Sequence, residues 1–431
     1  MQTVNNWAEQ GKAVLGVACG GVLATGETVA GTLAELWEAL PAAKSRLANG
    51  MAQVVNGDVD QLPGKLANVL DVPWEDARLD TDSLLSLALG YAVIIAAALL
   101  ICLIIHFPSV LYKMRLYAQG MMHLLFSTDK KWKPYATPAV PPAEAGYVPF
   151  RDIVFVRHGE STWNDTFNRS KNPIYFIPRL IKAWAYESWL FVSGRCDSWF
   201  YDSPLSAHGT GQAEELAAFL ASAIPLQDYT AKQSKFVTML KGGGTPAVHA
   251  VSNLRRAIST NAIALQERLR VTGEKMVMLP ALQEISRNID TLSLTPPGTT
   301  PVPSWVDASH PSLDLGAVFA DQIDASLHNG NKPVRSCGLD RLVGFCDWAF
   351  DQRKTNIIVG GHSLWFRAFF NEFLPASSTF AGKSAKLRNA GAVGFTLLRL
   401  RRSDDSFAYA IDESSITEIH GGFDVKKSKS K

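Results

Sequence analysis

Short apolar runs alternate with longer amphipathic stretches between residues 150 and 412, and this alternation predicts strands and helices that follow one another. The run at 153–156 predicts a short buried strand, and the runs at 247–252 and 356–360 predict two more. Further patterns predict helices at 254–270, 338–352 and 364–373 and a late hairpin at 393–400 and 407–411. We therefore expect an α/β fold, a three-layer sandwich with a mainly parallel sheet.

A different pattern lies upstream, where no Asp, Glu, Lys or Arg occurs between Asp82 and Lys113. The apolar core of this stretch, 84–107, is long enough to cross a bilayer, which takes about 20 apolar residues. A buried core helix is the alternative. Acidic residues precede the stretch and basic residues follow it, which favours a single-pass membrane protein with its C-terminal part in the cytosol.

These two patterns divide the chain into five predicted segments. Residues 1–82 form an N-terminal, mainly helical region to which we assign no function. A transmembrane helix at 83–112 precedes a basic juxtamembrane and proline-rich linker at 113–149, and such linkers are extended spacers. The α/β domain occupies 150–412, and 413–431 is a C-terminal tail that ends in a basic, solvated stretch.

The composition limits which partners and cofactors we expect. The formal net charge of +2 gives no reason to expect a nucleic acid as a partner. The five cysteines are scattered and match neither a disulfide framework nor a zinc pattern, which favours a reducing compartment. We find no spacing typical of metal ligands and expect neither a metal nor another cofactor.

The most informative motif, Arg157-His158-Gly159, directly follows the first predicted strand. Sites of α/β folds are built where strands end, and a histidine beside an arginine can be a nucleophile with its phosphate partner. The three residues alone are a weak signal, because a surface loop with an incidental histidine can have the same sequence. Whether they form a site depends on motifs in the rest of the chain.

Four later segments also place polar groups after apolar runs. Residues 202–209 lead into a helix, and 252–260 place Arg256 in the first turn of another, where N–H groups and a guanidinium bind anions. The remaining two segments centre on Glu284 and on His362, at the end of the strand predicted for 356–360.

In this order, the five segments resemble the histidine phosphatase superfamily, also called phosphoglycerate mutase-like, over residues 150–412. The chain is identified as a membrane-anchored, eukaryotic-type member. The resemblance implies that His158 is the nucleophile and forms a phosphohistidine, and that Glu284 donates a proton to the leaving oxygen. It also implies a set of phosphoryl- and substrate-binding residues: Arg157, Arg256 and His362, with Asn164, Ser161 and Ser363.

The same residue types suit the chemistry independently of any family. Two arginines and a second histidine can offset the charge on phosphoryl oxygens without a metal. A neutral imidazole is a competent nucleophile that turns one displacement into two. A carboxylic acid can protonate the departing alkoxide, and its carboxylate can then activate water.

The chain departs from the glycolytic mutases after Glu284. Residues 286–293 replace the tyrosine and the lysine-rich segment of those enzymes, and no paired arginines follow to bind a second phosphate. We therefore expect hydrolysis of phosphomonoesters. Mutase-type phosphoryl transfer is one alternative, and a membrane-anchored, non-catalytic interaction protein on the same fold is the other.

A second departure is the long segment between Asn164 and Asp202, which is rich in aromatic residues and carries Arg179 and Lys182. We interpret it as a lid or an extra core layer, with a membrane-surface element as the alternative. We expect the substrate to be a phosphorylated small molecule, lipid or protein. A basic rim around the predicted site would come from Arg287, Arg367, Lys386 and Arg388.

Overall fold

The computed structural model describes residues 99, 101–139, 148–169, 172–222, 230–242 and 245–424. The predicted N-terminal region, most of the predicted transmembrane helix (83–98 and 100) and the basic tail at 425–431 lie outside these residues. Among the helices that are described, none combines the length and the apolar character needed to cross a membrane.

Seven strands form one sheet in the order β4-β3-β2-β5-β1-β6-β7. Neighbours from β4 to β1 pair in parallel, whereas β6 is antiparallel to β1 and to β7. The prediction of a mainly parallel α/β sheet with a late hairpin is confirmed. The strands are β1 (Phe150–Arg157), β2 (Ala247–Val251), β3 (Met276–Met278), β4 (Ile323–Asp324), β5 (Asn356–Gly361), β6 (Ala392–Arg401) and β7 (Phe407–His420).

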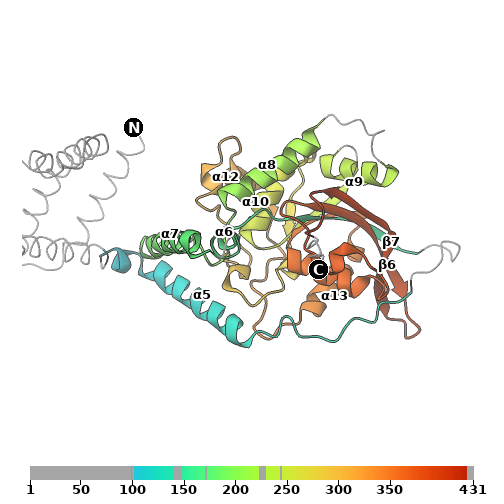
Figure 1. Cartoon of the computed structure of the whole chain (residues 1–431), viewed down its shortest axis with the longest axis horizontal. Helices are drawn as coiled ribbons and strands as arrows, with labels where there is room; N and C mark the ends of the chain where they lie inside the picture. The colour runs from blue at the N-terminus through green and yellow to red at the C-terminus, as the bar shows by residue number, and fades with distance from the viewer. Residues whose placement is uncertain are drawn as a thin grey trace, which may run out of the picture. The chain divides into compact units, whose positions relative to one another are not determined.

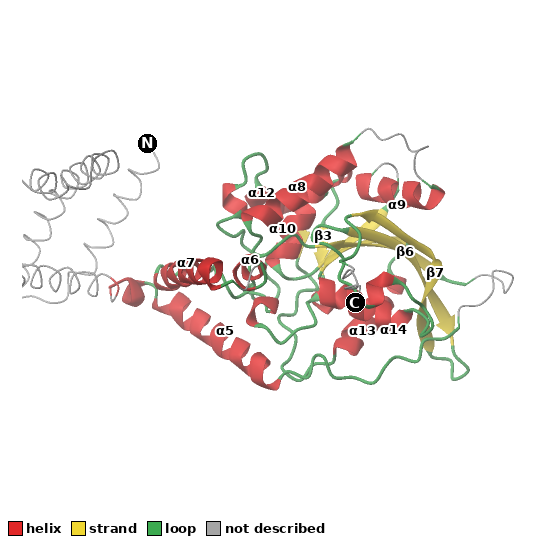
Figure 2. Ribbon diagram, viewed as in Figure 1, coloured by secondary structure: helices red, strands yellow, loops and turns green. Residues whose placement is uncertain are grey.

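Helices cover both faces of this sheet, as Figure 2 shows. The helix predicted at 254–270 is divided at Leu265, whose φ of −111° and ψ of 22° end α10 before α11 begins. The described α-helices are α5 (Phe107–Phe126), α6 (Thr162–Phe167), α7 (Pro173–Val192), α8 (Ala207–Ala221), α9 (Ala231–Lys241), α10 (Arg255–Ala264), α11 (Gln266–Thr272), α12 (Leu315–Asp321), α13 (Gly338–Asp351) and α14 (Ser363–Phe373).

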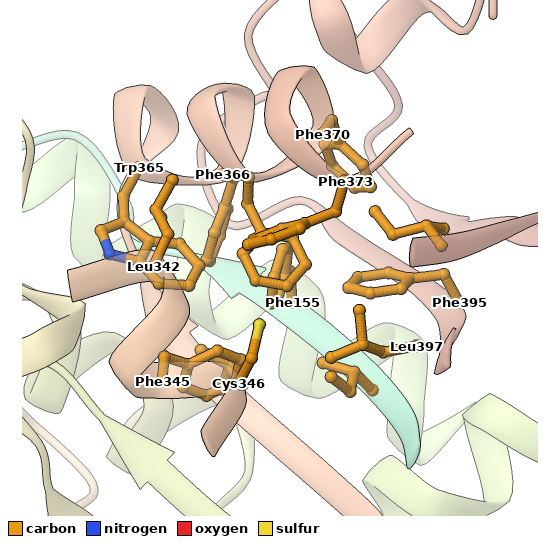
Figure 3. Close-up of a cluster of buried hydrophobic side chains, with 14 of the residues drawn as sticks. Phe155, Leu342, Phe345, Cys346, Trp365, Phe366, Phe370, Phe373, Phe395 and Leu397 are labelled. Atoms are coloured by element: carbon orange, nitrogen blue, oxygen red, sulfur yellow. The ribbon is translucent and has the colours of Figure 1, made fainter. Parts of the chain in front are cut away.

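The central run of β1, residues 153–156, is apolar because both faces of the strand are covered there. Ile153 and Phe155 belong to the core beneath α13 and α14, whereas Val154 and Val156 belong to the core beneath α8 and α9. Phe155 is at the centre of an aromatic cluster (Figure 3), and its ring stacks on Phe366 at a centroid distance of 4.2 Å. This central packing fixes the carboxyl end of β1, where the Arg-His-Gly motif begins.

The compact unit that contains the sheet starts at Leu99 and is more extensive than the predicted domain. Helix α5 occupies residues that we assigned to a membrane span and a linker, and it packs against the domain (Figure 1). The Tyr112 hydroxyl donates to the Leu294 carbonyl at 2.7 Å, and the Trp132 indole donates to the Glu372 carboxylate at 3.0 Å. These contacts make the described residues after Phe107 part of the domain rather than a spacer.

The long segment after Asn164 forms α6 and α7. Helix α7 begins at Pro173, where the side chain of Asn172 accepts a hydrogen bond from the N–H of Ile174. It lies beside α5 (Figure 1), and the Lys113 ammonium donates to the Leu190 carbonyl at 2.8 Å. Both helices therefore form one additional layer on the unit.

Candidate active site

A small pocket of about 100 Å³ opens where β1 and β5 end. The carboxyl ends of adjacent parallel strands meet at one edge of a sheet, and so segments far apart in the sequence converge there. The described lining residues are Arg157, His158, Trp163, Asn164, Asn168, Arg256, Glu284, Ser286, Asn288, Asp290, Thr291, Ser363, Leu364 and Lys386.

His158 is fixed at the base of the pocket by its backbone and its ring. Its N–H donates to the Gly361 carbonyl at 3.0 Å, and ring Nδ1 lies 2.5 Å from the Gly159 carbonyl oxygen. A carbonyl oxygen only accepts, so Nδ1 carries the proton and Nε2 keeps its lone pair. Burial, followed by the charges of Arg256 and Arg157, lowers the pKa of His158 well below its usual range. The ring is therefore neutral at physiological pH, as a nucleophile requires.

Gly159 is required because another chain segment passes directly over it. A Cβ atom at Gly159 would lie 2.3 Å from the Gly209 carbonyl oxygen, and one at Gly209 would lie 2.0 Å from the Glu160 carbonyl oxygen. The hydroxyl of Ser206 caps α8 by accepting from the Gly209 N–H at 3.1 Å. Residues 202–209 thus support the loop after β1 from behind rather than lining the pocket.

Two buried arginines bring positive charge to the pocket. The Arg157 guanidinium donates to the Leu387 carbonyl, and the Arg256 guanidinium donates to the Asp290 carbonyl at 2.6 Å. Burial lowers the pKa of Arg157 to about 10, which leaves the group charged at neutral pH. The Nε atoms of both arginines have no hydrogen-bond partner among the described residues. Two buried guanidinium groups with donors left over suit an anion as their partner.

His362 lies beside His158, with the two ring centroids 5.0 Å apart. Its Nε2 is 2.8 Å from the Ser252 hydroxyl oxygen, while the buried Nδ1 has no partner among the described residues. Burial and the nearby Arg256 lower the pKa of His362 well below its usual range. His362 does not line the pocket itself, and its neutral ring lies behind it, next to the ring of His158.

Glu284 is held at the N-terminus of α14 by main-chain donors. Its carboxylate accepts from the N–H groups of Trp365 at 2.9 Å, of Leu364 at 3.3 Å and of Ile285 at 3.0 Å. The first N–H groups of a helix have no partner within the helix, and they favour an acidic group. Helix α14 thus positions the carboxylate in the pocket wall.

A buried ion cluster supports the chain around Glu284 from behind. The Lys332 ammonium donates to the carbonyls of Glu284 at 2.5 Å and of Ser286 at 2.7 Å, and it pairs with Asp129 at 2.7 Å. Arg341 also pairs with Asp129, at 2.7 Å, and donates to the Gln283 carbonyl. Asp129 therefore neutralises two cations that fix the main chain around Glu284. Nothing in the sequence motifs indicates this role.

Asp290 is a second carboxyl group in the pocket, and we did not identify it from sequence as a site residue. Its Oδ2 lies 3.4 Å from Arg256 Nη2, while the buried Oδ1 has no hydrogen-bond partner among the described residues. Burial raises the pKa of Asp290 to about 6, with Arg256 opposing the rise and Glu284 adding to it. Asp290 therefore titrates close to physiological pH, next to a candidate phosphate ligand.

The structure separates the other predicted residues into two groups. Asn164 and Ser363 line the pocket, whereas Ser161 caps α6, where its buried hydroxyl accepts from the Asn164 N–H at 3.3 Å. Of the predicted basic rim, Lys386 lines the pocket; Arg287, Arg367 and Arg388 do not. Within the long segment after Asn164, α7 contributes no side chain to this pocket.

Within the described part of the chain, no group of three or more His, Cys, Asp or Glu side chains is placed to hold a metal ion. The pocket instead gathers one histidine, two arginines, one lysine and two carboxyl groups. This donor set suits an oxyanion rather than a cation.

No protein-family model and no curated protein sequence matches the chain. Three solved structures of phosphatases are similar to it at low identity. A mycobacterial glucosyl-3-phosphoglycerate phosphatase is 16% identical, covers 61% of this chain and 98% of its own, and gives a TM-score of 0.29. A phosphoserine phosphatase mutant from Entamoeba histolytica is 12% identical, covers 61% of this chain and 95% of its own, and gives a TM-score of 0.27. A putative alpha-ribazole-5'-P phosphatase from Escherichia coli is 11% identical, covers 64% of this chain and 99% of its own, and gives a TM-score of 0.29. Similarity this low carries no argument for the activity, which depends on the geometry above.

Proposed function

We propose that this protein hydrolyses phosphomonoesters in two steps through a phosphohistidine at His158. One observation carries the proposal: a buried, neutral histidine with a free Nε2 shares a small pocket with two guanidinium groups and a fixed carboxyl group. A nucleophile, an anion site and a proton carrier are the parts that phosphoryl transfer to an enzyme requires.

In the first step, Nε2 of His158 attacks phosphorus and the ester P–O bond breaks. Glu284 in its acid form gives a proton to the departing oxygen. Arg157 and Arg256 offset the charge that spreads over the other phosphoryl oxygens. The products are an alcohol and a phosphohistidine.

In the second step, water attacks phosphorus and the N–P bond breaks. The Glu284 carboxylate, left ionised by the first step, accepts the proton of the water. Inorganic phosphate leaves, and His158 and Glu284 return to their starting protonation states. The residues of the chain supply every proton transfer in this cycle.

Hydrolysis fits the pocket better than transfer between two positions of a substrate. A bisphosphate intermediate needs a second set of cations, and the segment after Glu284 supplies Ser286, Asn288 and Thr291 with one carboxylate, Asp290. A volume of about 100 Å³ also accommodates a phosphoryl group and little more. The alcohol portion of a small molecule, lipid or protein would extend outside.

The test uses the full chain and p-nitrophenyl phosphate, with His158→Asn as the variant. We expect release of phosphate by the wild type and a loss of about 10³-fold or more in the variant. His249→Asn is the matched control, because His249 is equally buried but bonds to Asn261, and neither lines the pocket. An acid-labile, alkali-stable phosphate label on the wild type, absent from His158→Asn, would identify the intermediate.

Three results would overturn the proposal. Equal activity of His158→Asn and the wild type would exclude this nucleophile, and absence of both label and phosphate release would favour a non-catalytic interaction protein. Transfer of label from a bisphosphate to an alcohol acceptor, in preference to water, would favour the mutase alternative.

A further inference from the structure

Helix α5 carries apolar side chains on two opposite faces. One face is buried against the domain and includes Val110, Leu116 and Gly120. On the other face, apolar side chains recur every three to four residues, which is the spacing of one side of an α-helix. Its large side chains are between 51% and 61% exposed: Phe107, Leu111, Met114, Met121 and Leu125.

Helix α7 repeats this arrangement. Its buried positions are Ala183, Glu187 and Leu190, and its outer face is apolar at helical spacing. The large side chains of that face are between 52% and 75% exposed: Ile174, Ile177, Ile181 and Trp184.

The two helices are fixed to each other and to the domain through polar contacts on their inner sides. The Tyr117 hydroxyl donates to the buried Glu187 carboxylate, which also accepts from the Trp199 N–H at 2.6 Å. With the Lys113 contact to Leu190, these bonds hold the outer faces away from the domain. Between the helices lies an apolar groove of about 390 Å³.

Exposure of this kind is concentrated in these helices and the residues just before α5. Elsewhere in the described chain, the large apolar side chains exposed to a similar degree are scattered: Val271, Val302, Leu327 and Phe407. A soluble surface rarely gathers so many apolar side chains without a partner. The outer faces of α5 and α7 therefore need an apolar environment.

Charge indicates which environment this is. Helix α5 has no acidic residue, and the one acidic residue of α7, Glu187, is buried. Arg115 on α5 and Lys182 on α7 are exposed. Apolar faces flanked by positive charge fit the boundary between lipid tails and anionic headgroups.

We propose that α5 and α7 together form a surface that binds an anionic lipid bilayer, with Ile177, Ile181 and Trp184 of α7 inserted between the lipids. The sequence supports this occupant, because the apolar stretch 84–107 leads directly into α5. The inference goes beyond the proposed hydrolysis and does not depend on it.

The experiment measures lipid contact at single positions of the full chain. One cysteine is introduced at Ile177 or Trp184, in a background in which the five native cysteines are replaced by serine or alanine. Each variant is labelled with a polarity-sensitive fluorophore and reconstituted into vesicles of phosphatidylcholine and phosphatidylserine. Brominated lipids then quench only labels that contact the bilayer.

We expect brominated lipids to lower the emission of both labels at least about twofold. Labels at Val302 and Phe407, which are equally exposed in the structure, are the matched controls and should stay unquenched. Vesicles of phosphatidylcholine alone should give less quenching at Ile177, because Arg115 and Lys182 lose their anionic partners.

Other outcomes would reject the proposal. If the labels at Ile177 and Trp184 report a polar environment and are not quenched, the face stays in water. If they report an apolar environment but are not quenched, protein covers the face, either a second copy or another segment of this chain. Equal quenching at all four positions would mean non-specific adsorption.

Discussion

Helices α14 and α7 have similarly apolar sequences but opposite surroundings. Trp365, Phe369 and Phe373 of α14 are fully buried against the sheet, whereas Ile177 and Trp184 of α7 are 52% and 68% exposed. Helix α14 also carries the pocket residue Ser363 at its start, while α7 contributes no side chain to the pocket. An apolar helical pattern therefore predicts a partner without identifying it: the sheet in one case and, as we propose, lipid in the other.

The largest contrast should appear in stability. Phe369→Ala removes a buried ring that contacts the rings of Phe155 and Trp365, and we expect the free energy of unfolding to fall by about 4 kcal/mol. Trp184→Ala on α7 is the matched change and should alter it by about 0.5 kcal/mol or less. Denaturant unfolding monitored by circular dichroism gives both values. A large loss for Trp184→Ala would show that α7 packs inside the protein.

A change at Asp129, which follows α5 in the chain and lies behind the pocket, tests whether this part of the protein influences catalysis. Asp129→Asn leaves Lys332 and Arg341 buried without a counter-charge, and we expect a loss of about 3 kcal/mol in stability. We also expect a lower kcat at temperatures where the variant is folded, because Lys332 holds the Glu284 main chain. Unchanged kcat in the folded variant would limit Asp129 to a purely structural role.

The pH dependence of substrate binding should depend on Asp290. With its pKa raised to about 6, Asp290 is neutral below that pH and ionised above it, where it shares Arg256 and repels a phosphate dianion. Asp290→Asn should therefore lower KM by roughly three- to tenfold at pH 8, or about 0.7–1.4 kcal/mol, and leave it unchanged at pH 5. The ratio of wild-type to variant KM isolates this effect from titration of the substrate. A ratio independent of pH would exclude it.

The smallest effect is expected on the outer face of α7. The triple variant Ile177→Ser, Ile181→Ser and Trp184→Ser should keep kcat/KM for p-nitrophenyl phosphate within about twofold of the wild type in detergent. These side chains are exposed and do not line the pocket. A tenfold loss would instead support the interpretation of the segment as a lid.

The long or strongly apolar elements could be predicted from sequence. Strands β1, β2 and β5 and helices α13 and α14 have unbroken patterns because the sheet buries them completely or along one side. Strands β3 and β4 are too short to produce a pattern, and β7 extends past the predicted end at residue 411 to His420, through a less buried stretch. Helix α5 was assigned to a span and a linker because apolar composition does not distinguish lipid from protein contact.

The residues of the pocket also divide into those that sequence motifs predict and those that they do not. Arg157, His158, Arg256, Glu284, Asn164 and Ser363 line it because motifs at strand ends must converge in a parallel sheet. Asp129, Lys332 and Asp290 lie outside those motifs, and their roles arise from contacts between distant segments. Burial and pairing determine such residues, and neither has a local spacing.

The main-chain contacts between α14 and Glu284 have a consequence for comparing sequences. The donors to the carboxylate are the N–H groups of Ile285, Leu364 and Trp365, and every residue except proline has one. Relatives could therefore carry any residue except proline at Leu364 and still hold the glutamate in the same place. The identity of the residue there would carry no information about how the carboxylate is held, even though its main chain contacts that carboxylate.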